Sequence, residues 1–133
     1  MKFIFYFLLK LFQSQNLKKQ AFSFPQTPQI RALINKLTRE GFLYGYKSIL
    51  VESDVNTQQK YLQVYLKYIE DSGVLTGTLH YHTYRVLQQV SYKHLLYLKY
   101  FSPVILIQTT RGILNHIEAI KFKLGGRILF ICL

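Results

Sequence analysis

The last third of the chain places a polar stretch between apolar runs in an order that few folds accommodate. The apolar run Val104–Ile107 leads into Gln108–Gly112, the QTTRG segment, and a second apolar run ends the chain. Asn115 followed three residues later by Glu118 has the spacing of a capping box and favours a helix start. Gly125–Gly126 favours the end of that helix, whose packing side chains would be Ile113, Ile117, Ile120 and Leu124. The order predicts strand, loop, helix and strand, with the QTTRG segment between a buried strand and a helix start.

The QTTRG segment carries side chains suited to phosphate or ribose. Thr109 and Thr110 supply two hydroxyls, each able to donate and accept a hydrogen bond. Arg111 supplies a planar group that binds phosphate through two N–H donors or stacks on a base. Gly112 lets the backbone turn and approach a ligand closely, and the following helix start would add N–H groups and a partial positive charge. An ordinary strand-to-helix turn is the alternative, and these residues alone leave both interpretations open.

The first half of the chain shows a different order of elements. Residues 1–12 are mostly apolar or aromatic, and the spacing of a helix face is met by Ile4, Phe7, Leu8 and Leu11. This run is too short to span a membrane, and no small-residue cleavage site of a signal peptide follows it. A strand over 21–24 comes next. Thr27 and Pro28 suit the N-cap and first position of a second helix, which Gly41 ends. Strands over 46–52 and 61–69 follow, joined by a polar connection over 53–60.

The second half is predicted to be mostly β. Strands are expected over 74–79, 84–90, 95–101 and 104–107, before the QTTRG segment, one helix and the last strand. Glu70–Gly73 is short and acidic and contains glycine, so it is the predicted linker. The chain is therefore expected to be α+β, with two small domains. Residues 1–70 would form an N-terminal α-β-α-β-β domain, and residues 73–133 a C-terminal β-rich domain with one helix.

The charge of the chain points to an anionic partner. There are 17 Lys and Arg residues against 6 Asp and Glu, which gives a net charge of +11. Residues 1–39 hold seven basic side chains and no acidic one, and residues 72–133 hold seven basic and one acidic. Nucleic acid or a membrane surface is the expected partner, met through two contact surfaces. The single cysteine, Cys132, excludes an internal disulfide and favours a reducing compartment.

The chain shows no pattern typical of a catalytic or metal site. His80 and His82 share one face of a strand, but no Cys pair or HExxH spacing accompanies them. The six carboxylates lack a neighbouring partner for acid–base chemistry, and nucleotide-binding and nucleophile-elbow motifs are absent. The sequence thus predicts no enzyme, metal ion, cofactor or small-molecule substrate. Tryptophan is absent while Phe, Tyr, Leu, Ile and Lys are abundant, which indicates an A/T-rich, organelle-type genome.

Three segments together carry a resemblance to a known family. The QTTRG segment, the helix after it, the double glycine and the last strand form one block, Pro25–Phe42 a second, and Leu66–Tyr68 a third. In order and spacing they resemble small-subunit ribosomal protein eight in its bacterial and organellar form. The resemblance implies a two-domain protein that binds the central domain of small-subunit rRNA and helps nucleate the platform of the subunit. It also implies contacts with neighbouring small-subunit ribosomal proteins and no free homo-oligomer.

The same resemblance assigns the main RNA contact to the QTTRG segment, that is Thr109, Thr110 and Arg111 with Gln108 and Gly112 beside them. The chain departs from the family at several positions. Gln108 stands in place of a serine, and Arg127 in place of an acidic residue close to the RNA. Ser91–His94 has lost the arginine of the family's S-R-P-G, which Lys93 and Tyr92 are expected to replace. Further RNA contacts are expected from Lys10, Lys18, Lys19 and Thr27. Such drift fits a mitochondrial ribosome, and the expected location is the mitochondrial matrix, with another organelle or the bacterial cytoplasm as alternatives.

A basic peripheral membrane protein is the second interpretation. Residues 1–12 would form an aromatic helical anchor, and the basic patches would contact anionic lipid. Flotation with liposomes, without sedimentation with ribosomes, is the result that this interpretation predicts.

Overall fold

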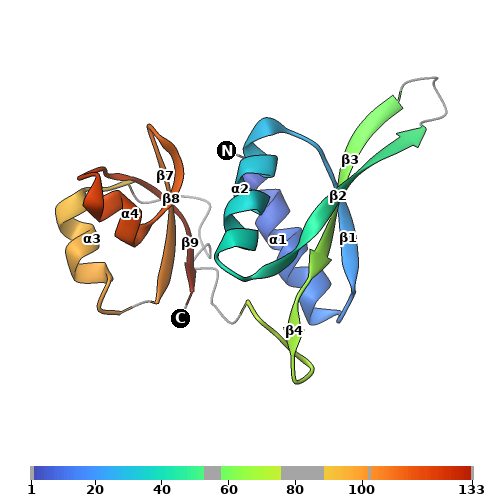
Figure 1. Cartoon of the computed structure of the whole chain (residues 1–133), viewed down its shortest axis with the longest axis horizontal. Coiled ribbons are helices and arrows are strands. Elements are labelled where there is room, and N and C mark those ends of the chain that lie inside the picture. Colours follow the sequence, from blue (N-terminus) through green and yellow to red (C-terminus); the bar gives the residue numbers. More distant parts are fainter. Residues whose placement is uncertain (1, 53–57, 76–88, 102, 133) are drawn as a thin grey trace. The chain divides into compact units, whose positions relative to one another are not determined.

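The computed structural model describes residues 2–52, 58–75, 89–101 and 103–132. Its contacts divide the chain into two compact units, unit 1 (Met1–Leu75) and unit 2 (Thr76–Leu133). Each unit combines helices with antiparallel strands (Figure 1). The predicted α+β class is therefore confirmed.

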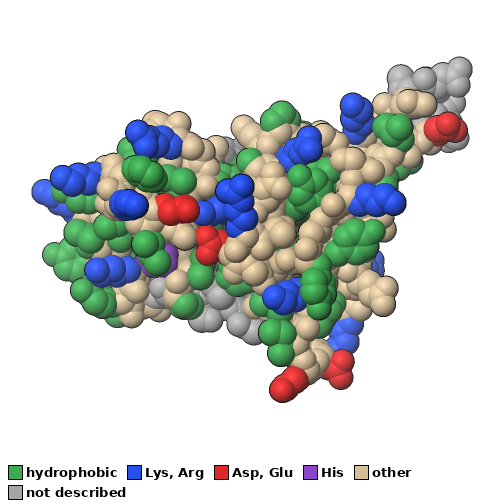
Figure 2. Space-filling view, in the orientation of Figure 1, with side chains coloured by type: hydrophobic (Ala, Val, Ile, Leu, Met, Phe, Trp, Pro, Cys, Tyr) green, Lys and Arg blue, Asp and Glu red, His purple; other side chains and the backbone are tan. Residues whose placement is uncertain are grey.

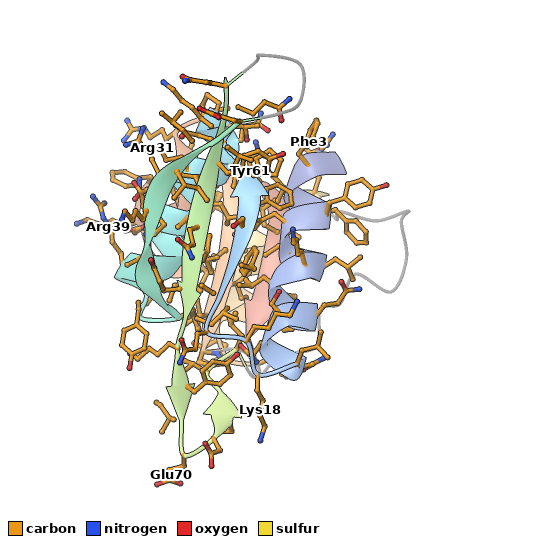
Figure 3. All side chains as sticks on the ribbon, turned by 90° about the vertical axis from the view of Figure 1, so that its right-hand side faces the viewer. Phe3, Lys18, Arg31, Arg39, Tyr61 and Glu70 are labelled. Atoms are coloured by element: carbon orange, nitrogen blue, oxygen red, sulfur yellow. The ribbon has the colours of Figure 1, made fainter. Side chains whose placement is uncertain are left out.

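Unit 1 packs two helices on one face of an antiparallel sheet. The elements are α1 (Lys2–Asn16), β1 (Ala21–Pro25), α2 (Pro28–Arg39), β2 (Leu43–Glu52) and β3 (Gln58–Leu66), and the strands lie in the order β1-β3-β2. Figure 3 looks onto the other face of this sheet, where Tyr61 is labelled. The predicted order α-β-α-β-β is confirmed. Strands β2 and β3 each begin three residues earlier than predicted. The hydrogen-bonded pairing between them includes residues on the N-terminal side of each predicted strand, Leu43 in β2 and Gln58 in β3.

The core of unit 1 lies between its helices and its sheet. The predicted α1 face of Ile4, Phe7, Leu8 and Leu11 is fully buried, as is an α2 face of Ile30, Leu33, Ile34 and Leu37. Across from them β3 buries every second side chain, Leu62, Val64 and Leu66. The predicted helix ends are also confirmed. Thr27 accepts a hydrogen bond from the Ile30 N–H at 3.3 Å, and Gly41, at φ +86°, follows α2 in the left-handed conformation.

Glu70–Gly73, the predicted linker, is instead the turn and second strand of a small hairpin. β4 (Tyr68–Ile69) pairs with β5 (Ser72–Gly73), and both turn residues, Glu70 and Asp71, have positive φ angles of 51° and 62°. Two consecutive left-handed residues are the geometry of the tight turns that join hairpin strands. The acidic composition that suggested a linker thus belongs to an exposed turn inside unit 1.

The last residues of unit 1 are fastened to α1 by one side chain. The Gln15 amide donates to the Leu75 carbonyl at 3.1 Å and accepts from the Leu75 N–H at 3.3 Å. Leu75 itself is buried. Gln15 reaches it by passing directly over Gly73, where a Cβ would collide with the Gln15 side chain. The absence of a side chain at Gly73 is therefore what permits both hydrogen bonds.

In its described residues, unit 2 forms a four-stranded sheet covered by two helices. Its elements are β6 (Gln89–Val90), α3 (Tyr92–Leu98), β7 (Val104–Thr109), β8 (Gly112–Asn115), α4 (His116–Lys121) and β9 (Gly126–Cys132), with the strands in the order β6-β9-β7-β8. The core contains Val90, Leu95, Ile105, Ile107 and Ala119. Of the strands predicted over 74–79 and 84–90, residues 76–88 lie outside the described residues.

The strand predicted over 95–101 is wrong, because this segment is mostly the helix α3. Ser91 caps the helix by accepting a hydrogen bond from the His94 N–H at 3.4 Å. Leu95 and Leu98, three residues apart, then point into the core. The run of apolar residues suits either a strand or a helix, and the cap at Ser91 is the signal that decides for the helix. The described part of unit 2 thus holds two helices where one was predicted.

We predict that Gly73→Ala destabilises the protein through Gln15. The new Cβ would displace the Gln15 side chain and remove both hydrogen bonds to Leu75, at about 1–3 kcal/mol of unfolding free energy. In a Gln15→Ala background the same substitution should cost much less, so the two changes should be strongly non-additive. Denaturant unfolding of the two single variants and the double variant measures this coupling. Additive losses would contradict the assignment.

Candidate nucleic-acid interface

The QTTRG segment is the turn of a β-hairpin, and the predicted strand-to-helix loop is wrong. Thr109 pairs with Gly112, Thr110 and Arg111 lie between them, and β8 follows before α4 begins. Gly112 has φ +100°, a conformation that L side chains rarely adopt. Sequence reasoning missed β8 because a four-residue strand is too short to show an alternating pattern.

The Thr109 hydroxyl holds the turn closed. It donates a hydrogen bond to the Gly112 carbonyl at 2.9 Å and accepts one from the Arg111 N–H at 3.2 Å. A hydroxyl has one donor and two acceptor positions, so these bonds use the donor and one acceptor. Of the two hydroxyls that were expected to bind a ligand, Thr109 therefore shapes the turn. Thr110 is exposed at its tip.

Arg111 lies over an aromatic ring. Its guanidinium carbon is 4.7 Å from the centre of the Phe122 ring, which is a cation–π contact. Stacking engages the flat face of the guanidinium, whereas its N–H donors point outward in the plane of the group. The contact orders a long side chain that is otherwise flexible and keeps its edge available to an anion. Phe122 was not among the candidate residues, because it becomes Arg111's neighbour only when β7 pairs with β8 and α4 has formed.

The start of α4 is separate from the turn. The predicted capping box is present: Asn115 Oδ1 accepts from the Glu118 N–H at 2.8 Å, and Glu118 Oε2 accepts from the Asn115 N–H at 3.1 Å. β8 places this cap about 10 Å from the turn, so the expected contribution of the helix start to the QTTRG segment is wrong. The helix is also shorter than predicted and ends at Lys121. Ile117, which was expected to pack inward, is 64% exposed, while His116 and Ala119 are buried.

The double glycine lets three strands approach one another. A Cβ on Gly126 would collide with the backbone of Gln108 on β7, and a Cβ on Gly125 would collide with the Val90 carbonyl on β6. Both obstacles are backbone atoms, which cannot move aside as a flexible side chain can. The glycines therefore bring β9 against the base of the QTTRG hairpin.

This approach places Arg127 beside Gln108. The two residues are opposite one another in the β7–β9 register, so their side chains emerge on the same face of the sheet. Arg127 is exposed. Gln108 is partly buried, and its Oε1 atom is buried without a hydrogen-bond partner in the described part of the chain. The two departures from the family pattern are thus neighbours in space.

The other candidates belong to other elements. Lys93 is exposed in the first turn of α3. The remaining four belong to unit 1. Lys10 donates to the Ser23 carbonyl at 2.8 Å, and Lys18, at φ 53°, lies in the turn after α1 (Figure 3). The Lys19 carbonyl accepts from the Tyr68 hydroxyl at 2.6 Å, and burial raises the pKa of Tyr68 above its usual value.

Thr27 and the Lys18–Lys19 pair lie at opposite ends of β1. Five strand residues, Ala21–Pro25, separate them, which corresponds to about 16 Å. Because the Thr27 hydroxyl caps α2, it already accepts one hydrogen bond. The structure therefore groups Gln108–Gly112 with Arg127 and does not gather the unit 1 candidates into one cluster.

Comparison with known families gives a match over nearly the whole chain. The family model described as ribosomal protein S8 matches residues 4–132. The chain belongs to the ribosomal protein S8 family. It is accordingly a small-subunit ribosomal protein, and the family is one of structural ribosomal proteins, not of enzymes. Among curated proteins no sequence matches the chain.

Within the described residues, no three His, Cys, Asp or Glu side chains gather as metal ligands. His80 and His82 fall outside those residues. The described helices include none with the length and apolar character needed to cross a bilayer.

We predict that Gly126→Ala destabilises the protein by about 1–3 kcal/mol, because the added methyl group forces β9 away from the Gln108 backbone. The neighbouring change Arg127→Ala, at an exposed side chain on the same strand, should alter stability by less than about 0.5 kcal/mol. Denaturant unfolding compares the two variants. Equal stability of the two variants would show that β9 does not need this close approach.

Proposed function

We propose that this S8 family member binds the central domain of small-subunit rRNA and supports assembly of the platform of a mitochondrial small ribosomal subunit. The match of the family model to residues 4–132 is the observation that carries the proposal. Neighbouring small-subunit ribosomal proteins would be its other partners. The proposed RNA contacts are Gln108, Thr109, Thr110, Arg111, Gly112, Lys93, Arg127, Lys10, Lys18, Lys19 and Thr27.

The geometry of the QTTRG turn supports recognition of an RNA helix by shape. Double-stranded RNA displays ribose hydroxyls and phosphates across a wide, shallow minor groove. The exposed Thr110 hydroxyl suits a ribose hydroxyl, and the Arg111 edge suits a phosphate. Because Thr109 and Phe122 already hold the turn and the guanidinium, little conformational freedom is lost on binding.

The charge of unit 2 supports the same partner. From residue 89 to residue 132 the sequence holds six basic side chains and one acidic one, a balance of +5. The one carboxylate, Glu118, accepts a hydrogen bond within the capping box. Figure 2 shows Lys and Arg side chains spread over this unit among hydrophobic ones. Such a surface steers a polyanion to the protein, with an affinity that falls as salt rises.

The mitochondrial assignment rests on composition. The chain lacks tryptophan and is rich in residues with A/T-rich codons, including 11 Tyr and 10 Phe. Arg127 and Gln108 differ from the usual family pattern, as expected where the rRNA has also changed. Recovery of the chain with the small mitoribosomal subunit, when a mitochondrial lysate is sedimented, would test the location.

A second candidate, a peripheral membrane protein, is favoured by one observation. α1 exposes Phe3 and Tyr6, at 60% and 50% of their surface, on the side away from its core residues. Aromatic side chains beside lysine are typical of helices that lie in a membrane surface. Flotation of the purified chain with anionic liposomes tests this candidate, and sedimentation with ribosomes instead would contradict it.

We predict that Arg111→Ala lowers the affinity for a central-domain rRNA transcript by about tenfold to a hundredfold, the range for a lost charge-assisted hydrogen bond. The slope of affinity against salt should also fall by about 0.9, the value for one phosphate contact. Filter binding at several salt concentrations measures both quantities. Arg39→Ala is the matched control, because it removes the same charge from an exposed position in unit 1. Equal losses for the two variants would contradict a specific role of Arg111.

We also predict different outcomes for the two threonines. Thr110→Val should weaken RNA binding while leaving the unfolding free energy unchanged, because its hydroxyl is at the exposed tip of the turn. Thr109→Val should lower the unfolding free energy by about 1–2 kcal/mol, since two hydrogen bonds of the turn are lost. Thermal unfolding and transcript binding separate the two effects. An unchanged affinity of Thr110→Val would remove this hydroxyl from the interface.

A further inference from the structure

Helix α3 presents two different faces. Leu95 and Leu98 point into the core of unit 2. At about 100° per residue, the side of the helix opposite these leucines carries Lys93, Tyr97 and Tyr100, and Phe101, four residues after Tyr97, lies at the edge of that side. The helical turn continues beyond Leu98, because the Tyr100 N–H donates to the Tyr97 carbonyl at 3.3 Å and the Phe101 N–H donates to the Leu98 carbonyl at 3.0 Å. The four side chains therefore share one face, which we name the aromatic face of α3.

The three rings on this face are unusually exposed. Tyr97 is 71% exposed, and Tyr100 and Phe101 are each 78% exposed. Three large aromatic side chains within five residues of one face leave apolar area in water that a free protein gains nothing by exposing. The inward face is already satisfied by leucine, so these rings are not needed for packing. This contrast marks the aromatic face as a contact surface.

Positive charge surrounds the rings. Lys93 lies on the same face, and the Lys99 ammonium is 5.0 Å from the centre of the Tyr100 ring. The sequence holds no Asp or Glu between residues 72 and 117. Figure 2 shows basic and hydrophobic side chains next to one another over α3. A partner that suits this surface has planar apolar faces and negative charge at the same spacing.

Unpaired nucleotides have both properties. We infer that the aromatic face of α3 is a stacking platform for unpaired rRNA nucleotides, with Tyr97, Tyr100 and Phe101 on the bases and the two lysines on the phosphates. Bases stack on tyrosine and phenylalanine with little sequence preference, and RNA loops, bulges and junctions offer bases that are free to do so. The inference rests on the proposed function and extends it, because the QTTRG segment would contact a helix and α3 the unpaired residues beside one.

A nucleotide partner suits this face better than a protein partner, because the rings alternate with lysines. Leu96, four residues before Tyr100, lies beside it on this face. It is only 37% exposed, whereas the three rings are 71–78% exposed, so rings and lysines provide most of the surface that a partner would meet. Acidic protein surfaces supply charge but few planar groups. Each nucleotide supplies a planar base and a negatively charged phosphate, so a run of nucleotides can contact the rings and the lysines together.

The test uses the full chain and a transcript of the central domain of small-subunit rRNA. Tyr97→Ala, Tyr100→Ala and Phe101→Ala together remove the rings and keep the Ser91 cap and the core leucines. We expect a loss of affinity of at least about tenfold, with an unchanged salt slope because both lysines remain. Chemical probing of ribose flexibility should show unpaired nucleotides that the unchanged protein protects and the variant exposes.

Two controls distinguish stacking from other causes. Tyr97→Phe with Tyr100→Phe keeps the rings and should retain the affinity, so a loss equal to that of the alanine variants would assign the effect to the hydroxyls and overturn the platform. Leu96→Ala removes an exposed apolar side chain from the same helix and should bind like the unchanged protein. Should thermal unfolding show that the triple variant is not folded, Tyr97→Ala against Tyr97→Phe makes the same comparison.

The outcomes separate the platform from the proposed function. If the unchanged protein does not bind the transcript, the proposed function itself fails. If it binds and the triple variant binds equally with the same protected nucleotides, the platform alone is overturned. Loss of a neighbouring ribosomal protein from reconstituted particles, with RNA affinity unchanged, would overturn the platform in favour of protein docking.

Discussion

The close approach of β9 to its two neighbours at Gly125 and Gly126 is the constraint on which unit 2 depends. Backbone atoms of Gln108 and Val90 occupy the positions where side chains would otherwise begin. Without this approach β9 could not lie between β6 and β7, and the QTTRG hairpin would lose the strand at its base. The same contact sets Arg127 opposite Gln108. The lack of side chains at Gly125 and Gly126 thus positions Gln108 and Arg127, which carry functional groups.

The two threonines of the turn have different roles. Thr109 uses its hydroxyl within the turn, whereas Thr110 is exposed at the tip. Arg111 is ordered in a similar way, by stacking on Phe122. In an interface with a polyanion, such ordering favours specific contacts because the side chains are placed before the partner arrives. The aromatic face of α3 would add a second kind of recognition in the same unit, by ring stacking where the turn uses hydrogen bonds.

Features that depend on neighbours in the sequence could be predicted. The caps at Thr27 and Asn115 and the buried face of α1 follow from residues three or four positions apart, and the structure contains all of them. Features that depend on pairing between distant or very short segments could not. β8 has only four residues, and the Glu70–Asp71 turn joins two strands of two residues each. Arg111 contacts Phe122 only after the hairpin and α4 have formed. The prediction for the α3 segment is wrong for another reason. Its apolar run fits both a strand and a helix, and only the cap at Ser91 distinguishes the two.

We propose that the tip of the QTTRG turn lies against one rRNA helix. The most direct test of this proposal is an iron chelate attached at Thr110→Cys, in a chain whose single native cysteine is replaced by Cys132→Ser, with RNA cleavage mapped along the central-domain transcript. We expect cuts confined to the two strands facing one minor groove, and a different pattern when the chelate is attached at Glu70→Cys in unit 1. Absence of cleavage from position 110, or the same scattered cuts from both positions, would contradict it.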